Sequence, residues 1–236
     1  RNGLKFFTAD GGLSSDDISQ ILDIASRGVF PPISKYGKVR QINTMRQYCE
    51  RLRNVICNGI KSKENHNKPL SGFKIAVDAG NGAGGFFAND VLKPLGADIS
   101  GSIFLEPDGT FPNHIPNPEN KEAMEFISKA VVDSNSDIGI IFDTDVDRAA
   151  IVDSKGKFIN RNKLIALSSA IVADESKNPI IVTDSVTSDY LKSFIANLGG
   201  KQFRFKRGYK NVIEAAKKFN NSGLNCPLAI ETSGHA

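Results

Sequence analysis

Two patterns of apolar residues alternate along the chain. Short continuous apolar runs, typical of buried strands, are separated by longer segments in which apolar residues recur every three or four positions, as on one face of a helix. Strands that alternate with helices favour parallel α/β layers, because each helix must cross back over the sheet before the next strand begins. The runs that predict strands lie at residues 4–8, 73–77, 138–142, 149–153, 180–183 and 202–205.

The helical segments group with these strands into three parts. Residues 14–17 supply capping side chains for a helix over 18–25, and a second helix is expected at about 40–60. The lysine-rich stretch 61–69 is typical of a linker, and the pattern restarts at Asn160. Further helices are expected at 119–133, 164–171 and 187–198. The expected parts are therefore residues 1–60, 61–159 and 160–236.

Composition and charge narrow the class of protein. The chain has 236 residues, of which 40% are hydrophobic and 24% charged, as in globular domains. A net charge of +4 without any long run of like charges predicts no nucleic-acid partner. No apolar stretch approaches the roughly eighteen residues of a membrane span, so no membrane partner is expected. Three scattered cysteines favour a reducing compartment, which we expect to be the cytoplasm, with a plastid as the alternative.

An acidic loop follows the apolar run 138–142. Residues 143–148 read DTDVDR, which puts three carboxylates at the C-terminal end of a buried strand, where ligands usually bind. Carboxylates at alternate positions of a tight loop can converge on one hard cation, and without it they would repel one another. We therefore expect Asp143, Asp145 and Asp147 to bind Mg²⁺ rather than to form a solvated acidic turn.

A glycine-rich turn lies between an apolar run and a helical segment. Residues 80–85 read GNGAGG, which fits the GxGxxG pattern of dinucleotide-binding turns, with Asp98 as a candidate ribose ligand. Such a turn also serves merely to reverse the chain tightly and to let a helix pack on a strand. We favour this structural interpretation.

Two polar loops near the end of the chain each allow two interpretations. Residues 231–235 read ETSGH, and their carboxylate, hydroxyls and imidazole suit the hydroxyl groups of a sugar, although an ordinary turn after a strand explains them equally well. Residues 206–210 read KRGYK, which suits a phosphate or a sugar phosphate but also a solvated basic turn. Near the start, Lys5 beside an apolar run is uninformative by itself.

Taken in order, the motifs NGLKFF, DAGNGAGG, FDTDVDR, KRGYK and ETSGH resemble the α-D-phosphohexomutase superfamily, in particular its phosphomannomutase/phosphoglucomutase branch. The resemblance covers nearly the whole chain. It implies consecutive three-layer α/β domains with mixed, largely parallel sheets. Residues 1–60 would then be the end of domain one with a linker helix, residues 61–159 domain two with the metal loop, and residues 160–236 the start of domain three with the sugar-binding loop.

The resemblance also implies roles for single residues. The family's metal loop, usually DGDGDR or DGDADR, has small residues where this chain has Thr144 and Val146. Tyr209 stands where many members carry histidine, and Lys5 matches a lysine proposed to handle protons. The residues that match the magnesium ligands and their arginine neighbour are Asp143, Asp145, Asp147 and Arg148. Those that match substrate-binding positions are Lys206, Gly208, Tyr209, Glu231, Ser233 and His235.

The implied reaction interconverts hexose 1-phosphate and hexose 6-phosphate through an enzyme phosphoserine and a hexose 1,6-bisphosphate, with Mg²⁺ as cofactor. The family's phosphoserine motif and its C-terminal phosphate clamp do not occur in this sequence, which has no initiator methionine. We therefore expect missing sequence on both sides and an inactive segment. Glucose, mannose and glucosamine phosphates all remain open as substrates.

Three other functions compete with this interpretation. A calcium-binding EF-hand is excluded, because Arg148 and Ser154 occupy the positions that need glycine and glutamate. A haloacid-dehalogenase-type phosphatase also has a DxD motif after an apolar strand, but it needs Thr or Val where Asp147 stands. A non-catalytic sugar-phosphate-binding module would use the glycine turn and the basic loop, and binding without turnover would distinguish it.

Overall fold

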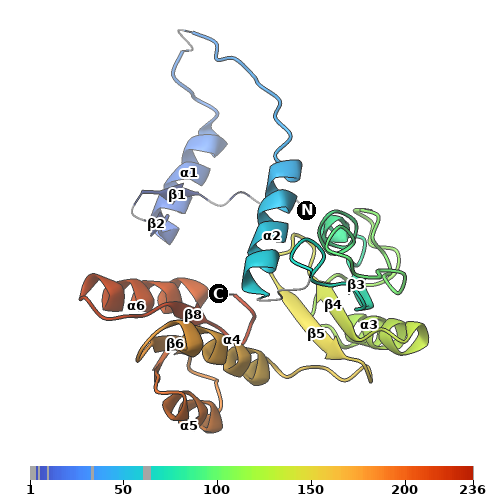
Figure 1. Cartoon of the computed structure of the whole chain (residues 1–236). Helices are drawn as coiled ribbons and strands as arrows, with labels where there is room; N and C mark the ends of the chain where they lie inside the picture. The colour runs from blue at the N-terminus through green and yellow to red at the C-terminus, as the bar shows by residue number, and fades with distance from the viewer. Residues whose placement is uncertain (1–3, 5, 10, 33–34, 61–64, 236) are drawn as a thin grey trace. The chain divides into compact units, whose positions relative to one another are not determined.

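The computed structural model describes residues 4, 6–9, 11–32, 35–60 and 65–235. The chain divides into two compact units, Arg1–Asn43 and Thr44–Ala236. Figure 1 labels most of their helices and strands, which are numbered in chain order. Within the described ranges, no helix combines the length and the apolarity that crossing a membrane requires.

The first unit contains a short hairpin and one helix. Strands β1 (Phe7–Thr8) and β2 (Gly11–Gly12) form an antiparallel ladder of two residue pairs. Of the predicted strand 4–8, Phe7 and Thr8 have ladder partners in β2, and Lys5 lies outside the described residues. Helix α1 (Ser15–Arg27) begins where its capping residues predict, since Ser14 Oγ accepts a hydrogen bond from the Asp17 main-chain N–H at 3.2 Å.

The first sheet of the second unit has the strand order β3-β4-β5. Strand β3 (Ile75–Asp78) is parallel to β4 (Ile138–Phe142), which is antiparallel to β5 (Ala149–Asp153). The chain between β3 and β4 forms η1 (Phe87–Leu92) and helix α3 (Lys121–Ser134). The predictions for β4 and β5 are confirmed with the same bounds, whereas the segment after the glycine turn is a π-helical turn rather than an α-helix.

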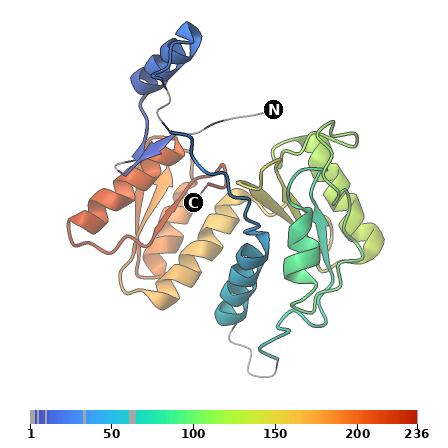
Figure 2. The same ribbon diagram turned by 90° about the horizontal axis from the view of Figure 1, so that it is seen from above.

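Helices cover both faces of this sheet (Figure 2). On one face, Ile127 and Val131 of α3 pack against the strands. On the other face, Ala88 of η1 packs against the sheet, and helix α2 (Met45–Gly59) packs on η1 through the buried Cys49. Strand β4 is therefore covered on both sides, which explains why its sequence is a continuous apolar run.

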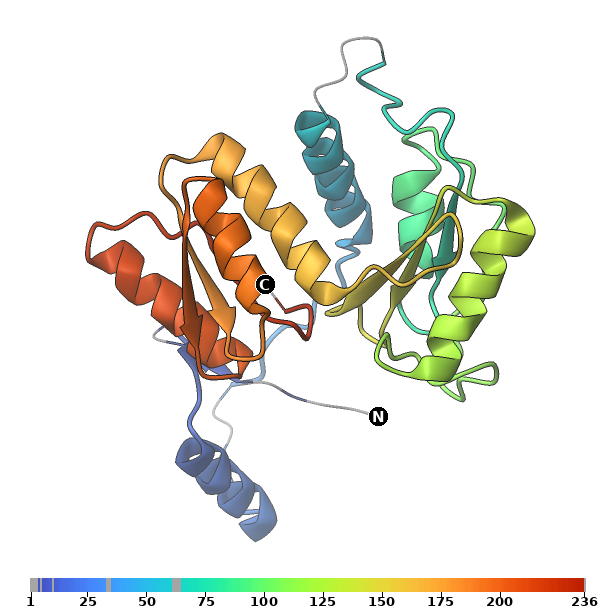
Figure 3. The same ribbon diagram turned by 90° about the horizontal axis from the view of Figure 1, so that it is seen from below.

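The second sheet has the order β7-β6-β8 and is entirely parallel. Its strands are β6 (Ile180–Asp184), β7 (Lys201–Phe205) and β8 (Leu228–Ile230). Its helices are α4 (Arg161–Glu175), α5 (Asp189–Asn197) and α6 (Tyr209–Asn221). Helices α4 and α5 pack Ile165, Leu191 and Ile195 onto one face, and α6 packs Val212 and Ala216 onto the other (Figure 3). The α/β fold class predicted from the sequence is thus confirmed.

The two sheets repeat one arrangement of elements. In each, the first strand in chain order ends in a fully buried aspartate, Asp78 on β3 and Asp184 on β6. In each, a parallel strand lies beside it, β4 beside β3 and β8 beside β6. The acidic loop 143–148 follows β4, and the polar loop 231–235 follows β8. The two candidate loops therefore occupy equivalent places in the repeated arrangement.

Candidate active site

The acidic loop 143–148, called the metal loop below, joins β4 to β5. Its two ends are tied together, because the Asp143 N–H donates to the Arg148 carbonyl oxygen at 3.1 Å and the Arg148 N–H donates to Asp143 Oδ1 at 3.0 Å. The buried strand β4 leads directly into Asp143, which is only 2% exposed. The fold therefore fixes the carboxylate of Asp143, whereas Asp145 and Asp147 lie farther along the loop and are exposed.

The three aspartates of the metal loop converge. One oxygen of each of Asp143, Asp145 and Asp147 lies within 4.8 Å of the other two. Burial raises the pKa of the Asp143 carboxyl; the main-chain hydrogen bond from Arg148 opposes this shift, and the neighbouring Asp147 adds to it. Carboxylates this close repel one another unless a cation lies among them, and a set of oxygen donors suits Mg²⁺. The residues present therefore fit a magnesium ion.

Arg148 offsets part of this negative charge. Its Nε lies 3.1 Å from Asp143 Oδ2 and 3.5 Å from Asp147 Oδ1. Its Nη1 donates a long hydrogen bond of 3.4 Å to Asn117 Oδ1, in the loop before α3. This single guanidinium faces three carboxyl groups, so the loop has more acidic than basic side chains.

Val146 holds the metal loop in a disfavoured backbone conformation. Its φ is 65°, in the left-handed region that a β-branched residue rarely adopts. Its side chain packs against the apolar cluster around Val77 and Phe142, which compensates part of the strain. The larger residue at this position thus has a packing role where the family commonly has a small residue.

The glycine turn 80–85 supports the metal loop. The Ala83 N–H donates to the Thr144 carbonyl oxygen at 2.9 Å. A Cβ at Gly82 would lie 2.8 Å from that same oxygen, so only glycine lets the two loops approach so closely. The candidate ribose ligand Asp98 instead accepts a hydrogen bond from the Ser100 N–H at 2.8 Å. These contacts support the structural interpretation of the turn.

A buried ion pair beneath the glycine turn was not predicted from the sequence. His114 Nε2 lies 3.0 Å from Asp78 Oδ2, and both side chains are fully buried. His114 Nδ1 lies 3.1 Å from the Ile115 carbonyl oxygen, so both ring nitrogens face acceptors, which favours the doubly protonated ring. Burial alone would lower the pKa of His114, but the hydrogen bonds to Asp78 and Ile115 and the charges of Asp78 and Glu122 outweigh it and raise the pKa.

The polar loop 231–235, called the sugar loop below, is closely hydrogen-bonded. Glu231 is 5% exposed, and its Oε1 accepts a hydrogen bond from the Gly208 N–H at 2.6 Å. Its Oε2 accepts from Ser233 Oγ at 3.0 Å, and Ser233 Oγ lies 2.9 Å from His235 Nδ1. The ring of Tyr209 lies 5.5 Å from that of His235, centroid to centroid. The structure thus brings together five of the six predicted substrate-binding residues.

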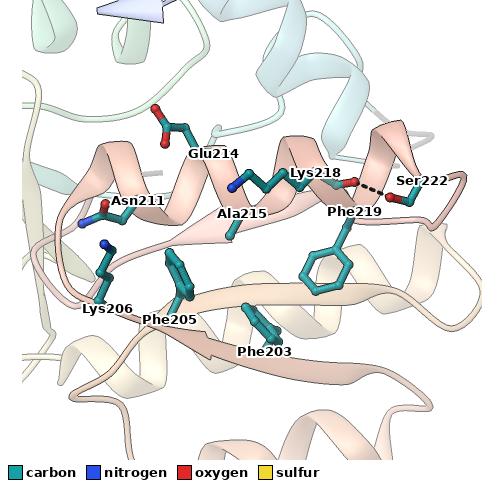
Figure 4. A pocket seen from close by; sticks show the side chains of 9 residues that line it. All are labelled: Phe203, Phe205, Lys206, Asn211, Glu214, Ala215, Lys218, Phe219 and Ser222. Carbon is teal, nitrogen blue, oxygen red and sulfur yellow. Dashed lines mark hydrogen bonds between the residues drawn. The ribbon is translucent and has the colours of Figure 1, made fainter. Parts of the chain in front are cut away.

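The side chain of Lys206 lies elsewhere. Its Nζ is 5.9 Å from the centre of the Phe205 ring. It lines a cavity of about 330 Å³ between β7 and α6, which Phe203, Phe205 and Phe219 also line (Figure 4). Lys206 directly follows the last residue of β7, and it lines the same cavity as Phe203 and Phe205 of that strand. Lys5, the other predicted lysine, lies outside the described residues.

The metal loop and the sugar loop meet. His235 Nε2 lies 3.5 Å from Asp147 Oδ2. A second link runs through Arg161, whose Nη1 donates to Glu119 Oε1 at 2.7 Å and to the Thr232 carbonyl oxygen at 2.8 Å. Arg161 and Glu119 were not predicted as site residues, because neither lies in a motif. The buried Asp184 could have been found, since like Asp143 it follows an apolar run.

Two family models match the chain in succession. Domain II of the phosphoglucomutase/phosphomannomutase family, described as alpha/beta/alpha, matches residues 46–156. Domain III of the same family matches residues 160–236. The matched residues cover the metal loop, the glycine turn, the basic residues 206–210 and the sugar loop. The haloacid-dehalogenase alternative finds no support in these matches.

Individual relatives agree with the family models. The chain is 30% identical to a phosphoglucomutase of Neisseria meningitidis serogroup A over 99% of its length, and 29% identical to a phosphomannomutase/phosphoglucomutase of Pseudomonas aeruginosa PAO1, also over 99%. It covers 47% and 46% of these two proteins, and so spans about half the length of the relatives it matches.

Solved structures show the same fold. A phosphoglucomutase/phosphomannomutase family protein from Burkholderia thailandensis superimposes with a TM-score of 0.76 over 98% of this chain and 53% of its own, at 24% identity. A phosphomannomutase-like protein from Thermus thermophilus superimposes with a TM-score of 0.67 over 95% of this chain and 48% of its own, at 16% identity. With its successive domain II and domain III matches, the chain belongs to the phosphoglucomutase/phosphomannomutase family of the α-D-phosphohexomutase superfamily.

Proposed function

We propose that this chain supplies the metal loop and the sugar loop of a phosphohexomutase, which moves a phosphoryl group between the 1- and 6-positions of a hexose. The observation that carries the proposal is the meeting of three convergent carboxylates with a polar loop suited to sugar hydroxyls, through the contact between Asp147 and His235 at 3.5 Å. A cation site beside a sugar-binding loop is what transfer of a phosphoryl group to a sugar requires.

Asp143, Asp145 and Asp147 would hold Mg²⁺. When bound, the ion would offset negative charge on the phosphoryl group during its transfer. Arg148, whose Nε already contacts two of these carboxylates, would keep them in place and add positive charge beside the transferring group. The residues of the loop thus bind and orient, and no proton transfer is assigned to them.

The sugar loop would recognise the hexose. Glu231 and Ser233 would exchange hydrogen bonds with its hydroxyl groups, with Gly208, Tyr209 and His235 beside them. A carboxylate has about four acceptor positions, so the two hydrogen bonds that Glu231 accepts leave capacity for a ligand. Lys206 is proposed to reach the substrate phosphate by a change of rotamer.

The group that carries the phosphoryl is proposed to be a phosphoserine, and this proposal rests only on the resemblance to the family. A phosphoserine would donate its phosphoryl group to a hexose monophosphate, and the resulting 1,6-bisphosphate would return the other group after turning around. Lys5 is proposed to take the proton of the attacking hydroxyl. We expect the 236-residue chain by itself to be inactive, because its sequence has no phosphoserine motif.

The test is a coupled assay of the complete protein, which follows conversion of glucose 1-phosphate and mannose 1-phosphate to the 6-phosphates. Asp145→Ala should lower kcat at least about a hundredfold with a much smaller change in KM, because the cation acts mainly on the transferring group. Asp133→Asn, at an exposed aspartate on α3, is the matched control and should leave both constants near wild type. An unchanged kcat in Asp145→Ala would remove the metal loop from the mechanism.

A further inference from the structure

Arg161 makes hydrogen bonds to both halves of the candidate site. It is the first residue of α4, and its side chain is 24% exposed. Its Nη1 donates to Glu119 Oε1 at 2.7 Å and to the Thr232 carbonyl oxygen at 2.8 Å. A terminal guanidinium nitrogen carries two N–H groups, so both bonds can exist at once. One side chain therefore joins the loop before α3 to the sugar loop.

On the side of the first sheet, the contacts continue to the metal loop. Asn117 Oδ1 accepts hydrogen bonds from the Glu119 N–H at 3.0 Å and from Arg148 Nη1 at 3.4 Å. Arg148 in turn pairs with Asp143 through its Nε at 3.1 Å. The hydrogen bond from Arg161 lowers the pKa of Glu119, so the pair is ionised at neutral pH and its bond is charge-assisted. A polar chain thus runs from the first metal ligand to Arg161.

On the side of the second sheet, Thr232 is held from two directions. Its N–H and its Oγ1 donate to Oδ2 of the buried Asp184, at 3.1 and 2.6 Å. Its carbonyl oxygen accepts from Arg161. Thr232 lies between Glu231 and Ser233, so a shift of its backbone would move both proposed sugar ligands.

The other link between the loops is weaker. His235 Nε2 and Asp147 Oδ2 are 3.5 Å apart, beyond the usual hydrogen-bond distance, and their side chains are 29% and 39% exposed. A partly exposed contact of this length contributes little positional restraint. Arg161 therefore provides the shorter of the two links among the described residues.

We infer that Arg161 is a positioning residue, which holds the sugar loop at the distance from the metal loop that phosphoryl transfer to a bound sugar requires. The inference rests on the proposed function. Misplacement of reacting groups by about 1 Å can cost on the order of a hundredfold in rate. Phosphoryl transfer in both orientations of the bisphosphate would need the same distance between the metal loop and the sugar loop. Loss of Arg161 should therefore slow turnover more than it weakens substrate binding.

The variants are Arg161→Met, which keeps the aliphatic stem without donors, and Arg161→Lys, which keeps the charge without the planar fork. Arg204→Met is the matched control, because Arg204 is 31% exposed and pairs at 2.8 Å with Asp189, within the second sheet and its helices. In the complete protein we expect Arg161→Met to lower kcat roughly ten- to a hundredfold with less than about a threefold change in KM. Arg161→Lys should recover part of the loss, and Arg204→Met should lose none.

Amide hydrogen exchange distinguishes a positioning role of Arg161 from an effect on the stability of the whole fold. Arg161→Met should speed amide exchange at residues 231–235 and 117–120, while amides of β3 and β6 keep their protection. Glu119→Gln should give the same pattern, and the double variant should cost no more than Arg161→Met alone, since both changes break one link. If Arg161→Met does not fold, Glu119→Gln can be used in its place.

A kcat near wild type in Arg161→Met, or unchanged exchange at residues 231–235, would overturn the inference. An equal rise in exchange throughout β3 and β6 would also overturn it, because the residue would then act on stability alone. If the complete wild-type protein shows no mutase activity, the proposed function fails, and the exchange experiment still decides whether Arg161 fixes the sugar loop.

Discussion

The metal loop and the sugar loop follow equivalent strands of the two sheets, yet the surroundings of their carboxylates differ. In the metal loop, three aspartates converge within 4.8 Å, and the guanidinium of Arg148 pairs with two of them. In the sugar loop, Glu231 already accepts hydrogen bonds from Gly208 and Ser233. The same position in a repeated fold thus gives one loop that is electrostatically incomplete without a cation and one that is organised before a ligand arrives.

The largest expected effect comes from the support of the metal loop. In Gly82→Ala the new Cβ would lie 2.8 Å from the Thr144 carbonyl oxygen, which is backbone and cannot move aside cheaply. We expect a loss of about 2–3 kcal/mol in the free energy of unfolding, together with weaker Mg²⁺ binding. Urea denaturation and Mg²⁺ titration would measure the two effects.

Gly109→Ala is the control for that experiment, because a Cβ there meets nothing within 4 Å. It should change stability by less than about 0.5 kcal/mol. Equal stabilities of the Gly82 and Gly109 variants would show that the metal loop does not depend on the glycine turn.

A slightly smaller effect is expected in the sugar loop. Glu231→Gln keeps the shape of the side chain but removes its charge, and charge-assisted hydrogen bonds contribute about 1.5–3 kcal/mol. In the complete protein, kcat/KM should therefore fall roughly ten- to a hundredfold, through both a higher KM and a lower kcat. Glu214→Gln, at a half-exposed glutamate on α6, should have no such effect. If Glu231→Gln lowers thermal stability with unchanged kinetics, the residue only organises the turn.

The buried pair of Asp78 and His114 beneath the glycine turn predicts that stability depends on pH. His114 has a raised pKa, so its stabilising contribution is complete below the ordinary histidine pKa of about 6.5 and is lost as pH rises through the higher folded value. His114→Gln should cost about 1–3 kcal/mol near pH 6 and less near pH 9. His66→Gln, at an exposed histidine, is the control. A pH-independent cost in His114→Gln would mean that the ring is neutral in the folded protein.

The smallest effect is expected at Val146. Val146→Gly removes the strain of a φ of 65° but also removes apolar contacts and makes the unfolded chain more flexible. These effects oppose one another, so the free energy of unfolding should change by less than about 1 kcal/mol. A loss of more than about 2 kcal/mol would show that packing of Val146, rather than its backbone, dominates. Differential scanning calorimetry would decide.

Elements with a local signal in the sequence could be predicted, and those that depend on distant contacts could not. Strand β4 and the convergence of three carboxylates after it were predictable, because a continuous apolar run indicates a buried strand and alternate positions of a tight loop can converge. The π-helical turn after the glycines was not, since its apolar spacing resembles that of an α-helix. His114 and Arg161 were not predictable either, because their roles depend on contacts 36, 42 and 71 residues away in the chain. Local patterns therefore identify the candidate ligands, whereas the contacts that hold them together are long-range and cannot be read from the sequence.

The central claim is that the metal loop is completed by a cation, and titration of this chain with Mg²⁺ by calorimetry tests it most directly. We expect weak binding, with a Kd on the order of 0.1–1 mM, because no phosphoserine oxygen is present to complete the ligand set. Asp145→Asn should abolish the heat of binding, and Asp133→Asn should leave it unchanged. Binding of the same strength in Asp145→Asn and wild type would contradict the account, because the cation would then bind elsewhere.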